Sequence, residues 1–156
     1  MPVSGGPYLV TACFCDKVLQ EADGVLSLIR IVDRWNVVGT TAAMLPTFVM
    51  GNLVILFKSG TVRGSAQLAI TPVTPDGERM TPILAPVLFE GDDERGAGVA
   101  LPINFPVKDT GLFWFEVALT ISGQSQILTF VPMRIVYLQQ AGAIAGMPPQ
   151  PPNMGR

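Results

Sequence analysis

Residues 111–137, GLFWFEVALTISGQSQILTFVPMRIVY, decide the fold. In the first half of this stretch, five apolar residues stand at alternate positions: Phe113, Phe115, Val117, Leu119 and Ile121. A two-residue period of this kind predicts a β-strand with one buried face. The polar residues 122–125 predict a turn, and the β-rich run at 127–137 predicts the returning strand. Two long strands of this composition need a second sheet to cover their apolar face.

Upstream of this hairpin, further β-rich runs predict the strands of the remaining fold. They lie at 8–14, 25–38 (with a bend after residue 32), 47–58, 66–71, 81–89 and 99–107. The centre of the third run, residues 53–57, is apolar at every position, which predicts a strand covered on both faces. Prolines 82, 86, 102 and 106 cannot donate to a sheet ladder. The run at 81–89 is therefore predicted at a sheet edge, and the run at 99–107 at an edge or a bulged position.

Two local signals interrupt the strand pattern. Asp16 is predicted to cap a single helical turn that runs through Leu19 and Gln20, and the pair Asp23 and Gly24 is predicted to end it. Asp33 and Arg34 are predicted to mark a bend within one strand region. The spacing of strands and turn signals favours an all-β fold, a two-sheet antiparallel sandwich of about eight strands, immunoglobulin-like, with at most one short helical turn.

The chain divides into three segments by composition. Residues 1–7 form a Gly- and Pro-containing arm, residues 8–140 form the β-sandwich domain, and residues 141–156 are rich in proline and glycine. The last segment lacks apolar periodicity, so a disordered tail is predicted there. Its PPQPP run at 148–152 is compatible with a polyproline II ligand, but a passive tail is the favoured interpretation because no basic residue lies nearer than Arg156.

Charge is sparse in this sequence. The chain has 49% hydrophobic residues, 10 Lys and Arg and 12 Asp and Glu, and it has no basic run. Nucleic acid is therefore not expected as a partner, and no apolar run reaches the roughly 18 residues of a membrane span. A monomer with so few charges would expose an unusually apolar surface, which favours a homo-oligomer or a complex with another protein.

Side chains suited to catalysis or metal binding are scarce. The absence of histidine removes Ser-His, Cys-His and His-ligated metal chemistry. Cys13 and Cys15 lie about 7 Å apart on one strand face, too far for a disulfide, and they are expected to be reduced thiols in the cytoplasm. Residues 92–94 are acidic but lack the alternating spacing of a calcium loop. We expect no cofactor, no metal and no enzymatic activity.

The two tryptophans are the candidate interaction residues, together with a neighbouring leucine. Trp114 shares the even-numbered face of its strand with Leu112 and Glu116, opposite the face of Phe113 and Phe115. Trp35 follows Arg34 at the predicted bend. Core or edge packing is the first interpretation of both indoles, while exposure would favour binding, because tryptophan is enriched at interfaces.

Both ends of the predicted domain resemble a bacterial domain-of-unknown-function family of small β-sandwich proteins. The resemblance rests on Cys15, Asp16, Asp23 and Gly24, on residues 109–117 (DTGLFWFEV), and on Gly123 with residues 131–135 (VPMRI). It spans residues 8–137 and implies an immunoglobulin-like fold without an assigned activity. Trp114 departs from the family pattern, in which tyrosine or a small residue is more usual.

These observations predict a non-catalytic interaction or assembly module that self-associates. Residues 53–57, and Leu112 with Trp114, are its candidate contact surfaces, and a twofold face-to-face dimer is expected. One alternative is a ligand-binding sandwich that uses exposed aromatic residues, with both indoles in one groove. A less favoured alternative is an enzyme without histidine, which would need a pocket where carboxylates converge.

Overall fold

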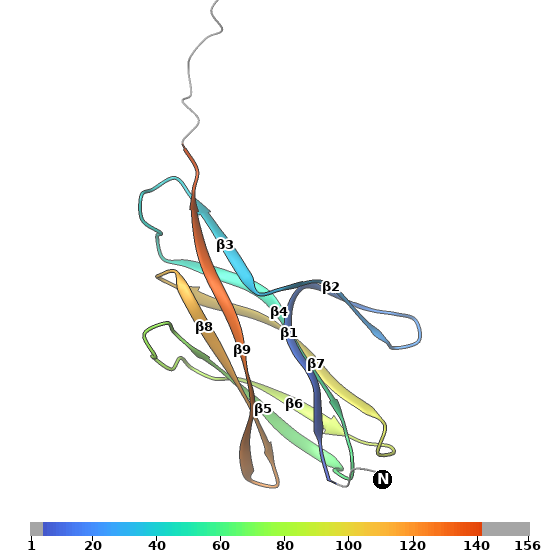
Figure 1. Ribbon diagram of the computed structural model, residues 1–156. Coiled ribbons are helices and arrows are strands. Elements are labelled where there is room, and N and C mark those ends of the chain that lie inside the picture. The colour runs from blue at the N-terminus through green and yellow to red at the C-terminus, as the bar shows by residue number, and fades with distance from the viewer. Residues whose placement is uncertain (1–4, 142–156) are drawn as a thin grey trace, which may run out of the picture.

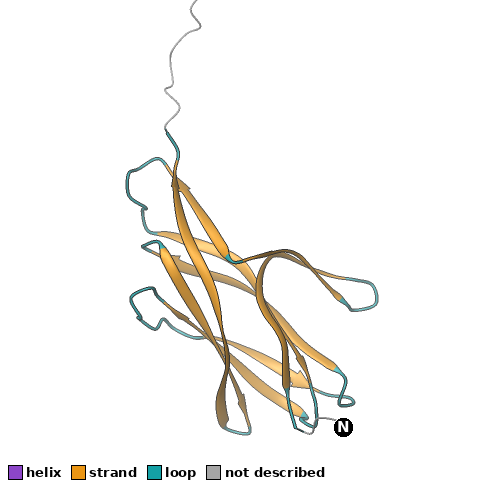
Figure 2. Cartoon of the chain, in the orientation of Figure 1, coloured by secondary structure: helices purple, strands orange, loops and turns teal. Residues whose placement is uncertain are grey.

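The computed structural model describes residues 5–141, and all of its regular elements are β-strands (Figures 1 and 2). A four-stranded sheet has the order β2-β1-β4-β7, and a five-stranded sheet has the order β3-β9-β8-β5-β6. The bounds are β1 Tyr8–Gln20, β2 Leu26–Val32, β3 Arg34–Gly39, β4 Thr47–Lys58, β5 Gly64–Val73, β6 Ile83–Phe89, β7 Gly96–Val107, β8 Gly111–Ile121 and β9 Gln124–Gln139. The all-β class and the two sheets are confirmed, with nine strands in place of about eight.

The hairpin of β8 and β9 is the centre of the five-stranded sheet. Its alternating residues Phe113, Phe115, Val117 and Leu119 are all buried, as predicted. The turn is tighter than the predicted four residues, since the strands end at Ile121 and resume at Gln124. Ser122 and Gly123 have φ values of 49° and 79°, the left-handed conformation that two-residue hairpin turns require.

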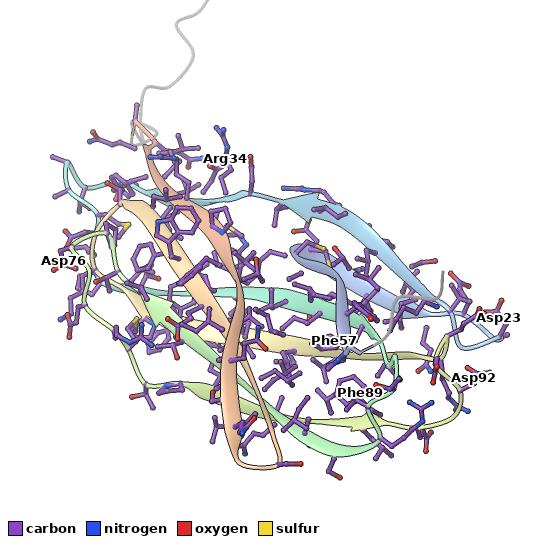
Figure 3. All side chains as sticks on the ribbon, turned by 60° about the horizontal axis from the view of Figure 1, so that its bottom comes forward. Asp23, Arg34, Phe57, Asp76, Phe89 and Asp92 are labelled. Carbon is purple, nitrogen blue, oxygen red and sulfur yellow. The ribbon has the colours of Figure 1, made fainter. Side chains whose placement is uncertain are left out.

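Aromatic side chains join the two sheets through the core. Phe14 on β1 packs edge-on against Phe115 on β8, with ring centroids 4.8 Å apart. Phe57 on β4 makes a similar contact with Phe89 on β6 at 5.6 Å. Figure 3 shows the second pair in the interior, with Asp23 and Asp92 at one end of the molecule and Asp76 at the other.

Strand β4 is buried on both faces at its centre, as its sequence predicted. Leu53 and Ile55 face the core, and Val54, which points the other way, is also fully buried. Asn52 on that second face donates a hydrogen bond to the Asp16 carbonyl at 2.9 Å, where β1 leaves β4. Residues 53–57 are therefore largely internal, which removes them as a candidate contact surface.

The predicted helical turn at Asp16 is wrong. Residues 16–20 continue β1 and pair with β2, with Gln20 opposite Leu26. The Asp16 carboxylate lies 3.1 Å from Nε of Arg30 across this hairpin and does not cap a helix. Gly24, with φ of 84°, closes a hairpin turn. Cross-strand pairing outweighed the local capping signal, because a single helical turn has little stability of its own.

The predicted bend at Asp33 moves the chain from one sheet to the other. β2 belongs to the four-stranded sheet, whereas β3 joins the five-stranded sheet beside β9. The β3–β9 pair is parallel, with Arg34 opposite Arg134, so the prediction of purely antiparallel sheets is wrong at this edge. A strand that arrives by crossing between sheets, and not through a hairpin turn, is free to run in either direction.

The proline-containing strands lie at sheet edges, as predicted. β6, with Pro86, ends the five-stranded sheet, and β7, with Pro102 and Pro106, ends the four-stranded sheet. Within residues 5–141 no helix is long and apolar enough to cross a membrane.

The predicted terminal segments fall mainly outside the described residues. Residues 1–4 of the arm and all of the predicted tail except Ala141 are not described. Gly5 of the arm accepts a backbone hydrogen bond from Thr61 at 2.8 Å. The described chain begins and ends at opposite ends of the molecule (Figure 1).

Candidate interaction surface

Trp114 lies on the outer face of the five-stranded sheet, away from the core. It stands opposite Pro132 of β9 and Val73 of β5. Its side chain is 40% exposed, and Phe130, one row further along β9, is 48% exposed. Pro132 is also exposed, and Leu112 at the start of β8 is half-buried. We call Leu112, Trp114, Phe130 and Pro132 the Trp114 surface.

An ion pair borders this surface. Arg79 donates two hydrogen bonds to the Glu116 carboxylate, from Nη1 to Oε2 at 2.8 Å and from Nη2 to Oε1 at 2.7 Å. The Glu116 side chain is only 8% exposed, whereas that of Arg79 is 57% exposed. A two-point contact of this kind fixes the plane of the guanidinium. The result is an ordered cation at the margin of an apolar patch.

The connection between β5 and β6 holds Arg79 in place. Gly77, with φ of 90°, and Thr74 form a turn in which Gly77 N donates to the Thr74 carbonyl at 2.9 Å. Beyond the turn, Arg79 forms an isolated bridge with Val73, and Met80 N donates to the Pro72 carbonyl at 2.8 Å. The backbone thus returns alongside β5, which brings Arg79 over Glu116 on the neighbouring strand.

The pairing keeps both groups charged. Hydrogen bonds from Arg79 lower the pKa of Glu116, an effect that exceeds the opposing effect of burial. The hydrogen bonds and the charge of Glu116 raise the pKa of Arg79 further above neutrality. A carboxylate with a lowered pKa is a weak proton acceptor near pH 7, so this pair suits a structural or recognition role better than acid-base chemistry.

Trp35 lies on the opposite face of the same sheet. Its neighbour on β9 is the buried Ile135. The indole packs against Phe14 at 5.0 Å and Phe105 at 5.7 Å, measured between ring centroids. The structure therefore separates the two tryptophans: Trp35 packs on the core and Trp114 lies outside. A single groove that holds both indoles, as the ligand-binding alternative required, is not formed.

Leu112 shares its row with two arginines. Arg134 of β9 stands opposite Leu112, and Arg34 of β3 stands opposite Arg134; both arginines are exposed. Arg34 lies 3.7 Å from the Asp33 carboxylate. Aromatic and arginine side chains are the types most enriched in protein interfaces, and here both gather on one sheet face.

The two cysteines are unpaired thiols on the outer face of the four-stranded sheet. Cys15 is fully buried and Cys13 is half-buried. Burial, and then the nearby Cys13 and Asp16, raise the pKa of the Cys15 thiol, which lowers its reactivity. In the described part of the chain, no group of three or more Cys, Asp or Glu side chains is placed to hold a metal ion.

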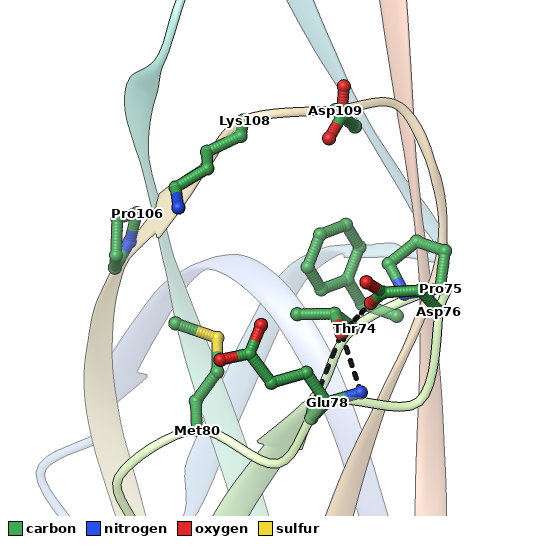
Figure 4. A pocket seen from close by; sticks show the side chains of 9 residues that line it. Thr74, Pro75, Asp76, Glu78, Met80, Pro106, Lys108 and Asp109 are labelled. Carbon is green, nitrogen blue, oxygen red and sulfur yellow. Dashed lines mark hydrogen bonds between the residues drawn. The ribbon is translucent and has the colours of Figure 1, made fainter.

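A cavity of about 390 Å³ opens at the end of the molecule near Asp76 (Figure 4). Asp76 and Glu78 line it from the β5–β6 connection, and Lys108 and Asp109 line it from the β7–β8 connection. The Asp76 carboxylate accepts a hydrogen bond from the Thr74 hydroxyl, which is the main cause of its lowered pKa. This carboxylate is therefore occupied in stabilising the turn and is a poor general base at neutral pH.

Comparison with known proteins identifies no family. No family model matches the sequence, and no curated protein matches it. Among solved structures, the fold is similar to part of a family 123 glycoside hydrolase from Clostridium perfringens, described for glycolipid glycan hydrolysis. The TM-score is 0.40 at 12% sequence identity, and the match covers 84% of this chain and 27% of that enzyme. A similarity at this level gives no information about activity.

Sequence reasoning placed Trp114 and Leu112 on one face correctly but missed the residues around them. Arg79 and Glu116 are 37 positions apart, and no spacing rule connects them. Phe130 carried a usable signal, because it stands in a strand predicted to pair with β8. The register that places it one row from Trp114 includes a bulge after Val117, which the sequence does not reveal.

Proposed function

We propose that the protein is a non-catalytic interaction module, built on an immunoglobulin-like sandwich, that self-associates through the Trp114 surface. The exposure of Trp114 beside Phe130 on the outer face of the five-stranded sheet is the observation that supports this role. Buried aromatic residues contribute strongly to interface energies, and a large exposed apolar patch on a soluble domain commonly marks a contact site.

A second copy is the occupant proposed for this surface. The Arg79–Glu116 pair is internally neutralised, so a copy docked over it meets no unpaired buried carboxylate. A twofold axis through the Trp114 surface would place the aromatic residues of both copies in one contact. Arg34 and Arg134 of each copy then lie toward its margin, where water screens them.

The proposed location is the cytoplasm. Cys13 and Cys15 are both free thiols, and a buried thiol such as Cys15 is compatible with a compartment that keeps cysteines reduced.

The alternative of a ligand-binding sandwich now rests on Trp114 alone, because Trp35 packs on the core. The alternative of an enzyme without histidine would have to use the cavity near Asp76, where Glu78, Lys108 and Asp109 also lie. The engaged Asp76 carboxylate and the neutralised Glu116 both favour the non-catalytic role.

A test of the proposed surface combines two substitutions. Trp114→Ala is expected to lower the self-association constant by about tenfold or more, as for an aromatic anchor at the centre of an interface. Phe48→Ala is the matched control, since Phe48 is 67% exposed on the other sheet. Sedimentation equilibrium measures the constants, and urea unfolding shows whether monomer stability is retained. Equal constants for the two variants would disprove the role of this surface.

Fluorescence gives an independent measurement. In a Trp35→Phe protein, Trp114 is the sole indole, because the sequence has two tryptophans. Its emission should shift to shorter wavelength, and iodide quenching should fall, as the protein concentration rises. If the protein associates but the emission of Trp114 does not change with concentration, the contact does not include Trp114.

A further inference from the structure

Residues 124–133 of strand β9 pair with another strand on only one side. β8 pairs with β9 from Gln124 to Ile135, but β3 pairs with it only from Arg134 to Gln139. Among the described residues, no strand pairs with the outer side of β9 at 124–133. A groove of about 490 Å³ lies beside this segment, between Gln126 and Leu128 on one side and Gly6 and Pro7 on the other. The backbone N–H and C=O groups on this side therefore lack strand partners.

The other sheet edges carry features that discourage strand addition. β6 and β7 contain prolines, and β3 is only six residues long. β2 contains Arg30 in a left-handed conformation, with φ of 54°, and this residue is paired with Asp16. Prolines, short strands, irregular backbone and charges are the usual means by which natural sheets avoid pairing with other chains.

From Gln124 to Val131, ahead of Pro132, the free edge of β9 has no proline and no charge, and its one irregularity is the bulge at Leu128. The sequence of this segment is QSQILTFV. Its second half consists of β-branched, aromatic and other apolar residues that favour strands. Ile127 and Phe130 are 51% and 48% exposed. A long, uncharged and exposed edge of this kind is suited to pairing with another strand.

We propose that this edge pairs antiparallel with the same edge of a second copy, about a twofold axis. Antiparallel pairing of identical segments is isologous, so the surface is complementary to itself. It brings no like charges together, because the segment has none. Exposed Ile127 and Phe130 side chains would gain cross-strand neighbours from the partner copy. The two five-stranded sheets would become one sheet of ten strands.

This inference rests on the proposed function, because it adds a second contact to face-to-face association through the Trp114 surface. Two different twofold contacts on one chain generate assemblies larger than a dimer, either a closed tetramer or an open chain of copies. A protein with both contacts is therefore an assembly module and not only a dimer.

The experiment uses substitutions that separate the two contacts. Ser125→Lys with Gln126→Lys places two positive charges on each copy at the β9 edge, where both residues are exposed. Ala100→Lys with Asn104→Lys is the matched control, at exposed positions on the proline-containing strand β7. Trp114→Ala removes the face contact. Sedimentation velocity of the full chain at tens of micromolar measures the size of each species.

The inference predicts that wild type and the β7 control form species larger than a dimer. The β9 variant should stop at a dimer, Trp114→Ala should also stop at a dimer, and the combination should be a monomer. Equal assembly of the β9 variant and the β7 control would overturn the edge contact. If Trp114→Ala assembles like wild type while the β9 variant does not, the face contact fails and the edge contact stands. A monomeric wild type would overturn both.

Amide hydrogen exchange provides a second readout in the Trp114→Ala protein. Successive N–H groups of a strand point to opposite sides, so about every second amide of residues 125–131 points away from β8. Those amides should exchange at least about tenfold more slowly in the associated protein than in dilute monomer. Equal exchange rates at both concentrations would contradict pairing at this edge, even if the variant associates.

Discussion

Arg79 and Glu116 form a two-point ion pair on the outer face of the five-stranded sheet, with N–O distances of 2.8 and 2.7 Å. The carboxylate belongs to the central strand β8, and the guanidinium comes from the connection between β5 and β6. A chain segment without regular structure is thereby anchored to the middle of a sheet, directly beside Trp114.

This pair predicts a defined pH dependence. Because Arg79 lowers the pKa of Glu116 in the folded protein, the stabilisation is fully present above the unfolded value, about 4.3. It is lost as the pH falls through the lower folded-state pKa. Wild type should therefore be more stable than Glu116→Gln at pH 7, and the difference should vanish in acid. Urea unfolding of both proteins between pH 7 and pH 3 measures this; a difference that is constant across the range would contradict it.

The packing of Trp35 is predicted to require a glycine at position 51. A Cβ atom at residue 51 would lie 2.2 Å from Cζ2 of the Trp35 ring, a distance that forces the indole to move. Gly51→Ala should destabilise the fold by about 1–3 kcal/mol, the usual cost of overpacking. Gly96→Ala is the control, since an added Cβ there meets only the Phe57 carbonyl oxygen at 3.7 Å. Smaller rings at 35 should relieve the clash, so Gly51→Ala with Trp35→Phe should recover part of the loss in urea unfolding.

Phe115 is predicted to be a principal core residue. It is fully buried and contacts Phe14 and Phe105 at centroid distances of 4.8 and 5.1 Å. Phe115→Ala should cost about 3–5 kcal/mol, through lost burial and the cavity left behind. The exposed Phe48→Ala should change stability by less than about 0.5 kcal/mol. Similar losses for both variants in denaturant unfolding would show that the core is assigned incorrectly.

The sequence predicted the elements of the fold better than their connections. Alternation at Phe113 to Leu119 identified the core face of β8, and the prolines of β6 and β7 identified sheet edges, because both signals are local. The helical turn predicted at Asp16 was wrong because local sequence does not distinguish a helix-capping residue from a strand residue with a cross-strand ion pair. The parallel β3–β9 pair and the free half of β9 follow from how the strands are ordered, which no local pattern encodes.

Residues 147–156 are predicted to be dispensable for folding. Four of these ten residues are proline, and they lack the alternating apolar residues of a strand. A chain that ends at Gly146 should keep the thermal midpoint of the full chain within experimental error. A fall of several degrees in calorimetry would show that this segment packs on the domain.

The central claim is that the protein assembles with itself through surfaces on its five-stranded sheet. The most direct measurement is the solution mass of the wild-type protein by sedimentation equilibrium, from about 1 to 100 micromolar. The chain mass is 16.6 kDa. The account predicts a mass that rises with concentration to at least twice this value. A mass of one chain across the whole range would contradict it.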